Sequence, residues 1–545
     1  MKTYNPNKSE TNRIPHGLKN HTELSAWFFN PRGISLLLLL LLLFSVNVFA
    51  ESAAKSNRIT ERQTYSQRAA SAPGKTLYIE MSQANMVISG EAQNDIVAEA
   101  NVELSIARPE LVKDFFSQTQ LVLEPYRQGF RLTLHSPKER YERRADQGIR
   151  RLVNLIFEGD ADGFSMATEL LVHVPANQAL VIENKYGDVS IDNVNGALQI
   201  DNTSGEVMIK RCEGSLDLKN NYAAAEVRDF KGAVAISNSS GAVTVANISG
   251  NVRIENSYKP VRFEKITGSL TIDGQSSDVS GASVSGDCFI TTSYKPISVS
   301  GVGGKLTING QSCLVTVAGV RQDVLIESSY QPIRVDSVGG ALTINGQSSA
   351  VTANMVAKDA TIRSSYQSIA VQQVGGILNI DGSSCEVTVR DIEKDASILS
   401  SYKTIRVDNV AGNLKVDGGS CSVLVDGVGG NVDITNSYKY IVLKRTAGSI
   451  DVRGDSSPIE VSQITKVPAG GSINLITTYK RVTLALPASA AVQISARTQY
   501  GKIRSDFPVY LNNDEDEGKA IKLELGNGGA VVRVETSGDI ILRKE

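Results

Sequence analysis

The chain contains little of the side-chain chemistry on which histidine-based catalysis and many metal sites depend. Its 545 residues include 4 His, 5 Cys and 1 Trp, and aromatic residues make up only 6%. Beyond residue 50, the only histidines are His135 and His173. A histidine-dependent catalytic triad and a multi-histidine metal site are therefore not expected, and no cofactor is predicted.

A surplus of either charge is also missing. The formal net charge is -2, from 56 basic and 58 acidic residues. Because nucleic-acid-binding domains usually carry a clear basic excess, no nucleic-acid partner is expected. The small number of large rings, together with 46 glycines, favours a core of Val, Ile and Leu in thin layers.

Only one long apolar run is present, and it lies near the N-terminus. Ile34 to Val46 is a 13-residue run with eight consecutive leucines, preceded by basic residues and followed by Val48-Phe49-Ala50. It is shorter than the ~20 residues of a membrane-spanning helix. Residues 1–50 are therefore predicted to be a secretory signal peptide, with an uncleaved anchor as the alternative. We expect export to the periplasm, outer membrane or surface of a bacterium, with no other membrane contact.

A regular repeat dominates the rest of the chain. A tyrosine returns at a constant 36-residue interval, at Tyr186, Tyr222, Tyr258, Tyr294, Tyr330, Tyr366, Tyr402 and Tyr438. A serine returns at the same interval, half a period after each tyrosine, at Ser204, Ser240, Ser276, Ser312, Ser348, Ser384, Ser420 and Ser456. A fixed period of this kind indicates a repeat architecture, here an 18-residue unit in two alternating versions.

Each unit contains two strand-like segments. When the tyrosine or serine is position 1, apolar residues recur at positions 4, 6, 9, 13 and 15, as in Ile333, Val335, Val338, Leu342 and Ile344. A spacing of two places side chains on one face of a strand. One unit cannot cover its own apolar face, so the units are predicted to stack at ~4.8 Å as rungs of an all-β parallel β-solenoid. A 36-residue rung is the alternative, less favoured because the apolar pattern closes within a single unit.

The cysteines follow the same register. Cys313, Cys385 and Cys421 occupy position 2 of serine-type units, and Cys212 and Cys288 occupy core positions. We expect all five to be free thiols that fill small spaces in the core. With 18-residue rungs, Cys385 and Cys421 are two rungs or about 10 Å apart, beyond the reach of a disulfide.

The remaining segments are assigned to the ends of the solenoid. Residues 51–75 are predicted to be a flexible leader, 76–185 an N-terminal cap with opening rungs, 186–485 the regular solenoid and 486–545 the closing rungs. Within the cap, Arg108 to Thr119 has helical spacing and is expected to plug the open end. Lys138 to Phe157 is predicted to be an amphipathic helix, interpreted as a packed insertion, with docking on a membrane or anionic glycan as the alternative.

Two loops interrupt the closing part. Tyr438 and Tyr479 are further apart than the other tyrosines of the series, so five extra residues are expected to form a loop around Lys466 to Gly470. Asn512 to Gly518 is an acidic run that lacks the spaced ligands of a calcium-binding loop. It is predicted to be a solvated turn.

Three short sequence motifs allow a comparison with a known family. They are Val174-Pro175 leading to Ile191, the Gly-x-Leu-x-Ile strands such as Gly304 to Ile308, and the ending Tyr500 to Ile503 with Gly538 to Ile540. From about Thr76 to Glu545 the chain resembles the bacterial β-strand-repeat adhesin family, related to the head domain of autotransporter adhesins. The resemblance implies a right-handed β-solenoid on the exported side of a bacterial membrane. It supplies no catalytic motif.

Glycan-cleaving solenoids need a carboxylate pair aimed at one sugar. Position 7 of the tyrosine units holds Asp192, Arg228, Glu264, Ser300, Asp336, Gln372, Asp408 and Lys444, without an acidic pair. An enzyme is therefore not expected. We predict a non-enzymatic solenoid with a repetitive surface, adhesin-like or structural in the cell envelope. An enzyme acting on envelope polysaccharide and a self-polymerising scaffold are the alternatives.

The candidate binding residues form what we call the tyrosine row: Tyr258, Tyr294, Tyr330, Tyr366, Tyr402 and Tyr438. They stand beside Lys, Gln or Pro at a predicted turn rather than at an apolar position. Rings on alternate rungs, about 10 Å apart, would offer aromatic faces to a glycan or another extended envelope polymer. In the alternative interpretation, each ring packs along the corner and its hydroxyl satisfies the turn.

Overall fold

The computed structural model describes residues 58–71, 74–138, 164–509, 511–514 and 518–545. The predicted signal peptide and most of the predicted 138–157 helix lie outside these residues. The chain divides into two compact units. The larger comprises Gln63–Val102, Thr119–Ser136 and Ala167–Glu545, and it contains the repeat.

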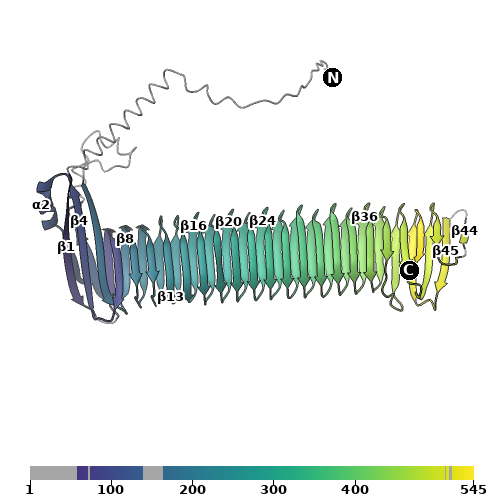
Figure 1. The fold of residues 1–545 in the computed structure, drawn as a ribbon, viewed down its shortest axis with the longest axis horizontal. Helices are drawn as coiled ribbons and strands as arrows, with labels where there is room; N and C mark the ends of the chain where they lie inside the picture. Colours follow the sequence, from purple (N-terminus) through teal and green to yellow (C-terminus); the bar gives the residue numbers. More distant parts are fainter. Residues whose placement is uncertain (1–57, 72–73, 139–163, 510, 515–517) are drawn as a thin grey trace, which may run out of the picture. The chain divides into compact units, whose positions relative to one another are not determined.

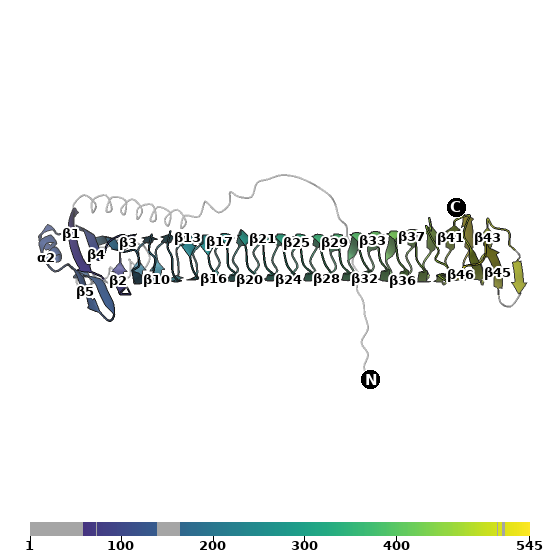
Figure 2. The same ribbon diagram turned by 90° about the horizontal axis from the view of Figure 1, so that it is seen from below.

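Each regular rung is formed by two short strands, one in each of two sheets. In β26 (Leu342–Gln347), alternate side chains are buried and the residues between them are partly or fully exposed. In β25 (Ile333–Val338), Ile333, Val335 and Val338 are buried, and the alternation shifts by one residue at Ser337, whose φ is 60°. Figure 2 shows the odd-numbered strands along one side of the repeat and the even-numbered strands along the other. The two sheets enclose a narrow core of Val, Ile and Leu.

The strands of the regular rungs follow one another in chain order in each sheet. The first sheet contains β9 (Val189–Asp192), β11 (Val207–Lys210), β13 (Ala225–Lys231), β15 (Val243–Ser249), β17 (Val261–Ile266), β19 (Val279–Val284), β21 (Ile297–Val302), β23 (Val315–Val320), β25, β27 (Val351–Val356), β29 (Ser368–Val374), β31 (Glu386–Ile392), β33 (Thr404–Val410), β35 (Ser422–Val428), β37 (Ile441–Thr446) and β39 (Ile459–Ser462). The second contains β10 (Leu198–Ser204), β12 (Leu216–Asn220), β14 (Val234–Asn238), β16 (Val252–Ser257), β18 (Leu270–Gln275), β20 (Cys288–Ser293), β22 (Leu306–Gln311), β24 (Val324–Ser329), β26, β28 (Ala360–Ser365), β30 (Leu378–Ser383), β32 (Ala396–Ser401), β34 (Leu414–Gly419), β36 (Val432–Ser437) and β38 (Ile450–Asp455).

Neighbouring rungs are about 18 residues apart. Val335 pairs with Ala353 in a parallel register, and Ala353 pairs in turn with Val371. The prediction of an 18-residue rung is therefore confirmed and the 36-residue alternative is wrong. The result is a β-solenoid of about 16 turns, visible in Figure 1 as a continuous series of parallel strands.

The irregularity in the 36-residue tyrosine interval lies where the sequence indicates, between Tyr438 and Tyr479. Ile450 pairs with Ile473 and Ile459 pairs with Val482, so at this point each register jumps further along the chain than in a regular rung. The five extra residues fall between β39 and β40 (Ser472–Thr477), the region of the predicted 466–470 loop. The core pattern resumes at once because both strands keep their inward-facing residues.

The first rung of the chain is not at the end of the stack. β2 (Thr76–Gln83) and β3 (Asn85–Glu91) stack directly on β8 (Ala179–Tyr186) and β9. On their other side they pair with β6 (Gly129–His135) and β7 (Phe164–Pro175). The chain between β3 and β8 also forms β4 (Asp95–Ile106) and β5 (Gln120–Tyr126). The expected opening rungs exist, but their spatial order differs from their order in the sequence.

The C-terminal end repeats this arrangement. β46 (Ala530–Thr536) lies between β40 and β42 (Val492–Thr498), and β47 (Ile540–Lys544) lies between β41 (Val482–Leu486) and β43 (Ile503–Ser505). The last two strands of the sequence, β46 and β47, thus lie in space between strands that come earlier in the sequence. β45 (Gly518–Leu525) pairs antiparallel with β42 and with β44 (Leu511–Asp514). The predicted 512–518 loop is consequently shorter than expected, because its first residues belong to β44.

The expectation of a flexible leader over 51–75 is wrong for its second half. Ile59–Ala70 forms β1, which pairs with β4. None of its side chains is fully buried, although Tyr65 packs against the core, and its mostly polar residues gave no apolar signal. Side chains tie it to β4 instead: Thr64 donates a hydrogen bond to Asn101 at 2.6 Å, and Arg68 pairs with Asp95.

The predicted helix over 108–119 is present in the smaller unit as a 3₁₀ turn, Pro109–Leu111, and a helix, α2 (Val112–Ser117). Phe115 and Phe116 are its buried residues. Their ring centroids are 5.7 Å apart in an edge-to-face arrangement, and Phe115 makes a similar contact with Phe164. Pro109 initiates the turn, as its fixed φ favours.

Candidate functional site

Each member of the tyrosine row stands at a tight corner where the second sheet of one rung passes to the first sheet of the next. The φ angles of the six tyrosines lie between 61° and 68°, in the left-handed region. At Tyr258, the amide of Lys259 donates to the carbonyl of Ser257 at 2.9 Å across the tyrosine. The same bond spans Tyr330, Tyr366, Tyr402 and Tyr438. A positive φ inside a three-residue hydrogen-bonded turn is the strained form of γ-turn.

The backbone of the corner is anchored to the next rung. The amide of Tyr294 donates to the carbonyl of Gln311, and that of Tyr330 donates to Gln347, both at 2.8 Å. These hydrogen bonds depend only on the main chain. They hold each tyrosine at a fixed place along the stack, so that the rings recur on alternate rungs about 10 Å apart.

The rings of the row are turned to solvent. Their exposed fractions range from 66% at Tyr258 to 73% at Tyr402. In the part of the chain that the structure describes, their hydroxyls make no hydrogen bond. Exposed tyrosines extend the series at both ends, at Tyr186, Tyr222, Tyr479 and Tyr500. The alternative in which each hydroxyl satisfies its turn thus has no hydrogen bond to support it among the described residues.

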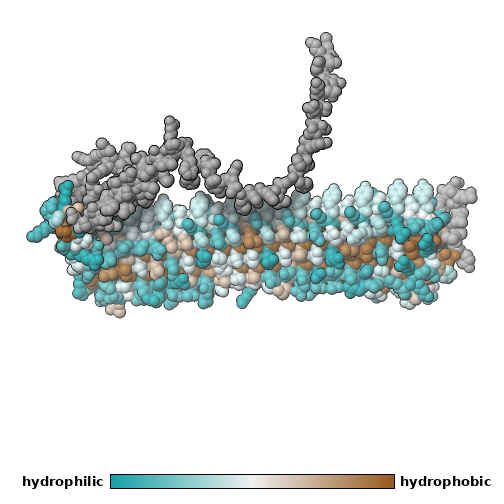
Figure 3. Space-filling model, turned by 45° about the horizontal axis from the view of Figure 1, so that its top comes forward, coloured by the Kyte–Doolittle hydropathy of each residue, from teal (hydrophilic) through white to brown (hydrophobic). Residues whose placement is uncertain are grey.

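The residue after each tyrosine is also exposed. It is a lysine at positions 259, 295, 403 and 439, and a glutamine at positions 331 and 367. Together with the rings, these side chains form a line of aromatic and hydrogen-bonding groups along one edge of the larger unit. Evenly spaced projections along one margin are visible in the space-filling view (Figure 3).

The opposite edge of the solenoid has its own repeated bond, which recurs on alternate rungs. The Asp323 carboxylate accepts from the Ala341 amide at 3.0 Å, and Asp359 and Asp395 accept from the same position of the next rung. The bond to Ala341 holds the pKa of Asp323 below its usual range. A Cβ on Gly340 would meet Asp323, so glycine leaves room for the bond. This edge is structural.

All five cysteines are buried and unpaired, as predicted. Burial raises the pKa of Cys288 to about 12 and that of Cys421 to about 11. Burial also raises the pKa of the other three thiols. Thiols held neutral in this way are poor nucleophiles and poor metal ligands.

One carboxylate pair was not predicted from the sequence, because its members belong to alternate kinds of rung. Asp408 and Asp426 are direct neighbours in the first sheet. Arg390 lies 3.3 Å from Asp408, and Arg445 pairs with Asp426. Each carboxylate is therefore compensated by its own arginine on an open sheet face.

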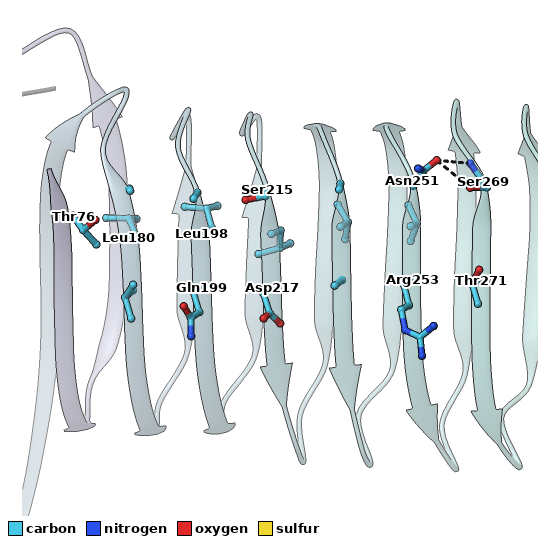
Figure 4. A pocket seen from close by; sticks show the side chains of 18 residues that line it. Thr76, Leu180, Leu198, Gln199, Ser215, Asp217, Asn251, Arg253, Ser269 and Thr271 are labelled. Atoms are coloured by element: carbon cyan, nitrogen blue, oxygen red, sulfur yellow. Dashed lines mark hydrogen bonds between the residues drawn. The ribbon is translucent and has the colours of Figure 1, made fainter. Parts of the chain in front are cut away.

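In the part of the chain that the structure describes, shallow grooves run across successive rungs. One, of about 490 Å³, crosses the second sheet where Ala197, Ser215 and Ala233 leave space, with Gln199, Asp217 and Arg253 beside it (Figure 4). Another, of about 950 Å³, follows the edge that contains Asp391, Glu393 and Arg445. Neither of these two grooves contains a cysteine or histidine.

The described ranges contain no group of three or more His, Cys, Asp or Glu residues that could hold a metal ion. Within the same ranges, no helix has the length and apolarity needed to cross a membrane. Comparison of the chain with protein-family models, with curated proteins and with solved structures finds no match in any of the three.

Proposed function

We propose that this protein is a non-enzymatic, exported β-solenoid whose tyrosine row binds an extended polymer, in an adhesin-like or envelope-structural role. The observation that carries the proposal is the combination of strain and exposure at the row. Six aromatic residues occupy a backbone conformation that disfavours them, yet most of the surface of each is left in solvent.

Neither the backbone nor the core explains these rings. A left-handed conformation costs a residue other than glycine ~1–2 kcal/mol. Near the end of each first-sheet strand a residue takes the same conformation, and there its type varies, as at Met355, Asn409 and Gly427. In alternate rungs, the position equivalent to the tyrosine is a serine in the same conformation, as at Ser312 and Ser348. The corner can therefore form without a ring. Strained residues that are not needed for packing are concentrated at functional sites.

The geometry suits a long ligand better than a small one. The rings recur at a constant interval along the stack, and each offers an aromatic face and a hydroxyl with no hydrogen bond to the described residues. A small molecule would contact one ring on a convex edge. A linear polymer would contact many rings at once, and the second and later contacts would benefit from a high effective concentration.

Export and an envelope location belong to the same proposal. They are supported by the apolar segment Ile34 to Val46, the basic residues before it and the Val48-Phe49-Ala50 sequence after it. The resemblance to bacterial β-strand-repeat adhesins supports the same role. N-terminal sequencing of the protein from fractionated cells should give Glu51 as the first residue, whereas a retained Met1 in the cytoplasm would contradict export.

The binding test is a series of Tyr→Ala changes at 294, 330, 366 and 402, singly and together. Each protein is scored for its melting temperature and for retention on cellulose, chitin and polygalacturonate. Each lost ring should weaken retention by a modest and similar factor with little change in melting temperature, because the ring is exposed. Tyr→Phe changes at the same positions should keep most of the retention, since the aromatic face remains.

Ser→Ala changes at 312, 348, 384 and 420 provide a matched control, because these serines occupy the same corner of alternate rungs. They should leave retention unchanged. If melting temperature falls steeply with each Tyr→Ala change while retention per folded molecule stays constant, the row is structural and the proposal is wrong.

Self-association is a second candidate, favoured by the spacing of the row. Two rows with rings about 10 Å apart interleave at about 5 Å, within the ~4.5–7 Å centroid distances of aromatic pairs. Sedimentation velocity and electron microscopy of the purified protein distinguish this role. Pairs or filaments that dissolve in the fourfold Tyr→Ala variant would favour the scaffold, whereas a monomer at all concentrations would exclude it.

A further inference from the structure

We propose that the polymer bound by the tyrosine row is a linear acidic glycan, with its carboxylates on the lysines that follow the tyrosines. This inference rests on the proposed function and adds the charge of the ligand. It is carried by a second set of residues: Lys259, Lys295, Lys403 and Lys439.

These four lysines are exposed and, among the described residues, have no ion-pair partner. Many basic side chains elsewhere on the solenoid do have one. Arg390 pairs with Asp408, Arg445 pairs with Asp426, and Lys305 lies 3.7 Å from Asp323. The ammonium groups of the row are thus available to an external anion without the loss of an internal contact.

The edge that holds the row has the opposite sign to the chain as a whole. The corner residues at positions 18, 1, 2 and 3 between Ser257 and Pro458 include these four lysines against three acidic residues, Asp278, Glu386 and Asp455. The complete chain has a formal net charge of -2. A basic edge on an acidic protein attracts anions and directs them to that edge.

Each of these lysines is the chain neighbour of a ring of the row. Lys259 directly follows Tyr258, and its amide closes the γ-turn at 2.9 Å, so ring and ammonium group leave the same corner. A sugar could lie against the ring while its carboxylate reaches the lysine. The interval of about 10 Å between such corners is close to the length of two sugars in an extended chain, which gives equivalent contacts to a repeating glycan.

A glycan fits better than a nucleic acid. Lysines on alternate rungs are more widely spaced than the phosphates of duplex DNA, which recur every ~3.4 Å along each strand. Nucleic-acid sites also carry denser clusters of Arg and Lys.

At Tyr330 and Tyr366 the neighbouring residue is glutamine, so the centre of the row is neutral and the charge lies in two pairs of lysines on either side.

The test compares two polymers with one backbone: polygalacturonate, and polygalacturonate whose carboxylates are fully methyl-esterified. Binding of the full chain is measured by affinity electrophoresis at low and at physiological salt. The acidic form should bind more tightly, and salt should weaken its binding more than that of the ester. A fourfold Lys→Gln variant at 259, 295, 403 and 439 should lose affinity for the acidic form, by at most about fivefold per lysine, and should bind the ester as before.

Lys→Gln changes at 358, 394, 415 and 444 are the control, because these exposed lysines lie away from the row and remove the same charge. They should have little effect. Equal binding of acid and ester, or an unchanged affinity in the first variant, would overturn the acidic ligand while the Tyr→Ala series still tests the row itself. Tighter binding of single-stranded oligothymidylate than of polygalacturonate would overturn the glycan.

Discussion

Ser328 and Cys313 are joined by a reciprocal pair of hydrogen bonds inside the corner of the solenoid. The Ser328 hydroxyl donates to the Cys313 carbonyl at 3.0 Å and accepts from the Cys313 amide at 3.3 Å. Ser364 bonds to Ser349 in the same way, and Asn436 bonds to Cys421. In each case the residue two places before a tyrosine is position 17 of a serine-type unit. Its side chain satisfies the main chain at position 2 of that unit.

This pair explains why the repeat alternates. Position 17 before each serine from Ser276 to Ser456 is glycine, and at Gly310 an added Cβ would lie 3.1 Å from the Cys313 Cβ. The interior corner therefore accommodates the small side chain at position 2 of a serine-type unit and the polar side chain at position 17 of the same unit. The 36-residue period of the sequence is the period of this interior packing.

Ser328→Ala should destabilise the protein by ~1–3 kcal/mol, because the buried amide and carbonyl of Cys313 lose their partner. Thermal unfolding followed by circular dichroism measures the effect. The neighbouring residue provides the control: Ser329→Ala, at a partly exposed side chain, should change the melting temperature little. Equal stability of the two variants would show that the reciprocal bonds contribute nothing.

Gly376→Ala should destabilise by ~1–3 kcal/mol through overpacking. Its Cβ would overlap the side chain and amide of Asp359 in the rung before it, and a main-chain amide cannot move aside cheaply. Gly529→Ala is the matched change, since its Cβ would meet only the Ala491 carbonyl at 3.5 Å. Urea unfolding of both variants checks the difference, and a larger loss at Gly529 would contradict this account of the glycine positions.

The Asp323 bond should make stability depend on pH. The bond to Ala341 lowers the pKa of Asp323 in the folded protein. Its contribution is therefore complete above the unfolded value, about 3.9, and is lost as the pH falls through the folded value. Melting temperatures of wild type and Asp323→Ala should differ at neutral pH and converge in acid.

Asp323→Asn separates the effect of the negative charge from the effect of the hydrogen-bond acceptor, because asparagine keeps only the acceptor. The chain itself uses asparagine at this position, where Asn413 accepts from the Asn431 amide at 2.8 Å. The asparagine variant should retain the bond and show less acid sensitivity than wild type. The same pH profile in all three proteins would rule out a role for this carboxylate in acid unfolding.

The cysteines should be unreactive until the protein unfolds. Burial raises the pKa of Cys288 to about 12 and of Cys421 to about 11, so both remain neutral thiols at pH ~8. These raised values imply stability that is complete below the unfolded pKa of ~8.5 and declines as the pH rises above it. A thiol reagent should label no cysteine in the native protein and all five after unfolding without reductant. Labelling of only one would indicate disulfides.

Substitution of one cysteine tests whether its side chain serves only to fill a small space in the core. Cys385→Ser should cost little, because Ser349 and Ser457 occupy the same position 2 and are equally buried. Cys385→Leu should be strongly destabilising, because the Cys385 side chain is completely buried and a larger one overpacks the corner. Comparable melting temperatures for the two variants would show that the corner is not tightly packed.

Local features of the sequence were sufficient to predict the regular solenoid. Residues spaced by two lie on one face of a strand, and the pattern from Ile333 to Ile344 closes within one unit. The pairing of Val335 with Ala353 follows from that pattern, as does the longer jump from Ile450 to Ile473. The exposure of the tyrosine row was also predictable, because position 1 lies outside the apolar pattern.

Other features depend on contacts between distant segments. Main-chain hydrogen bonds pair strands without regard to side chains, so no pattern in Ile59–Ala70 revealed its pairing with β4 or the insertion of β46 between β40 and β42. Asp408 and Asp426 meet only when adjacent rungs stack. The strain at Tyr258 is likewise a property of the closed turn. Sequence determined the rung, because its alternation is local; tertiary structure decided the ends, the corners and the charge pairs, because those are set by which rungs become neighbours.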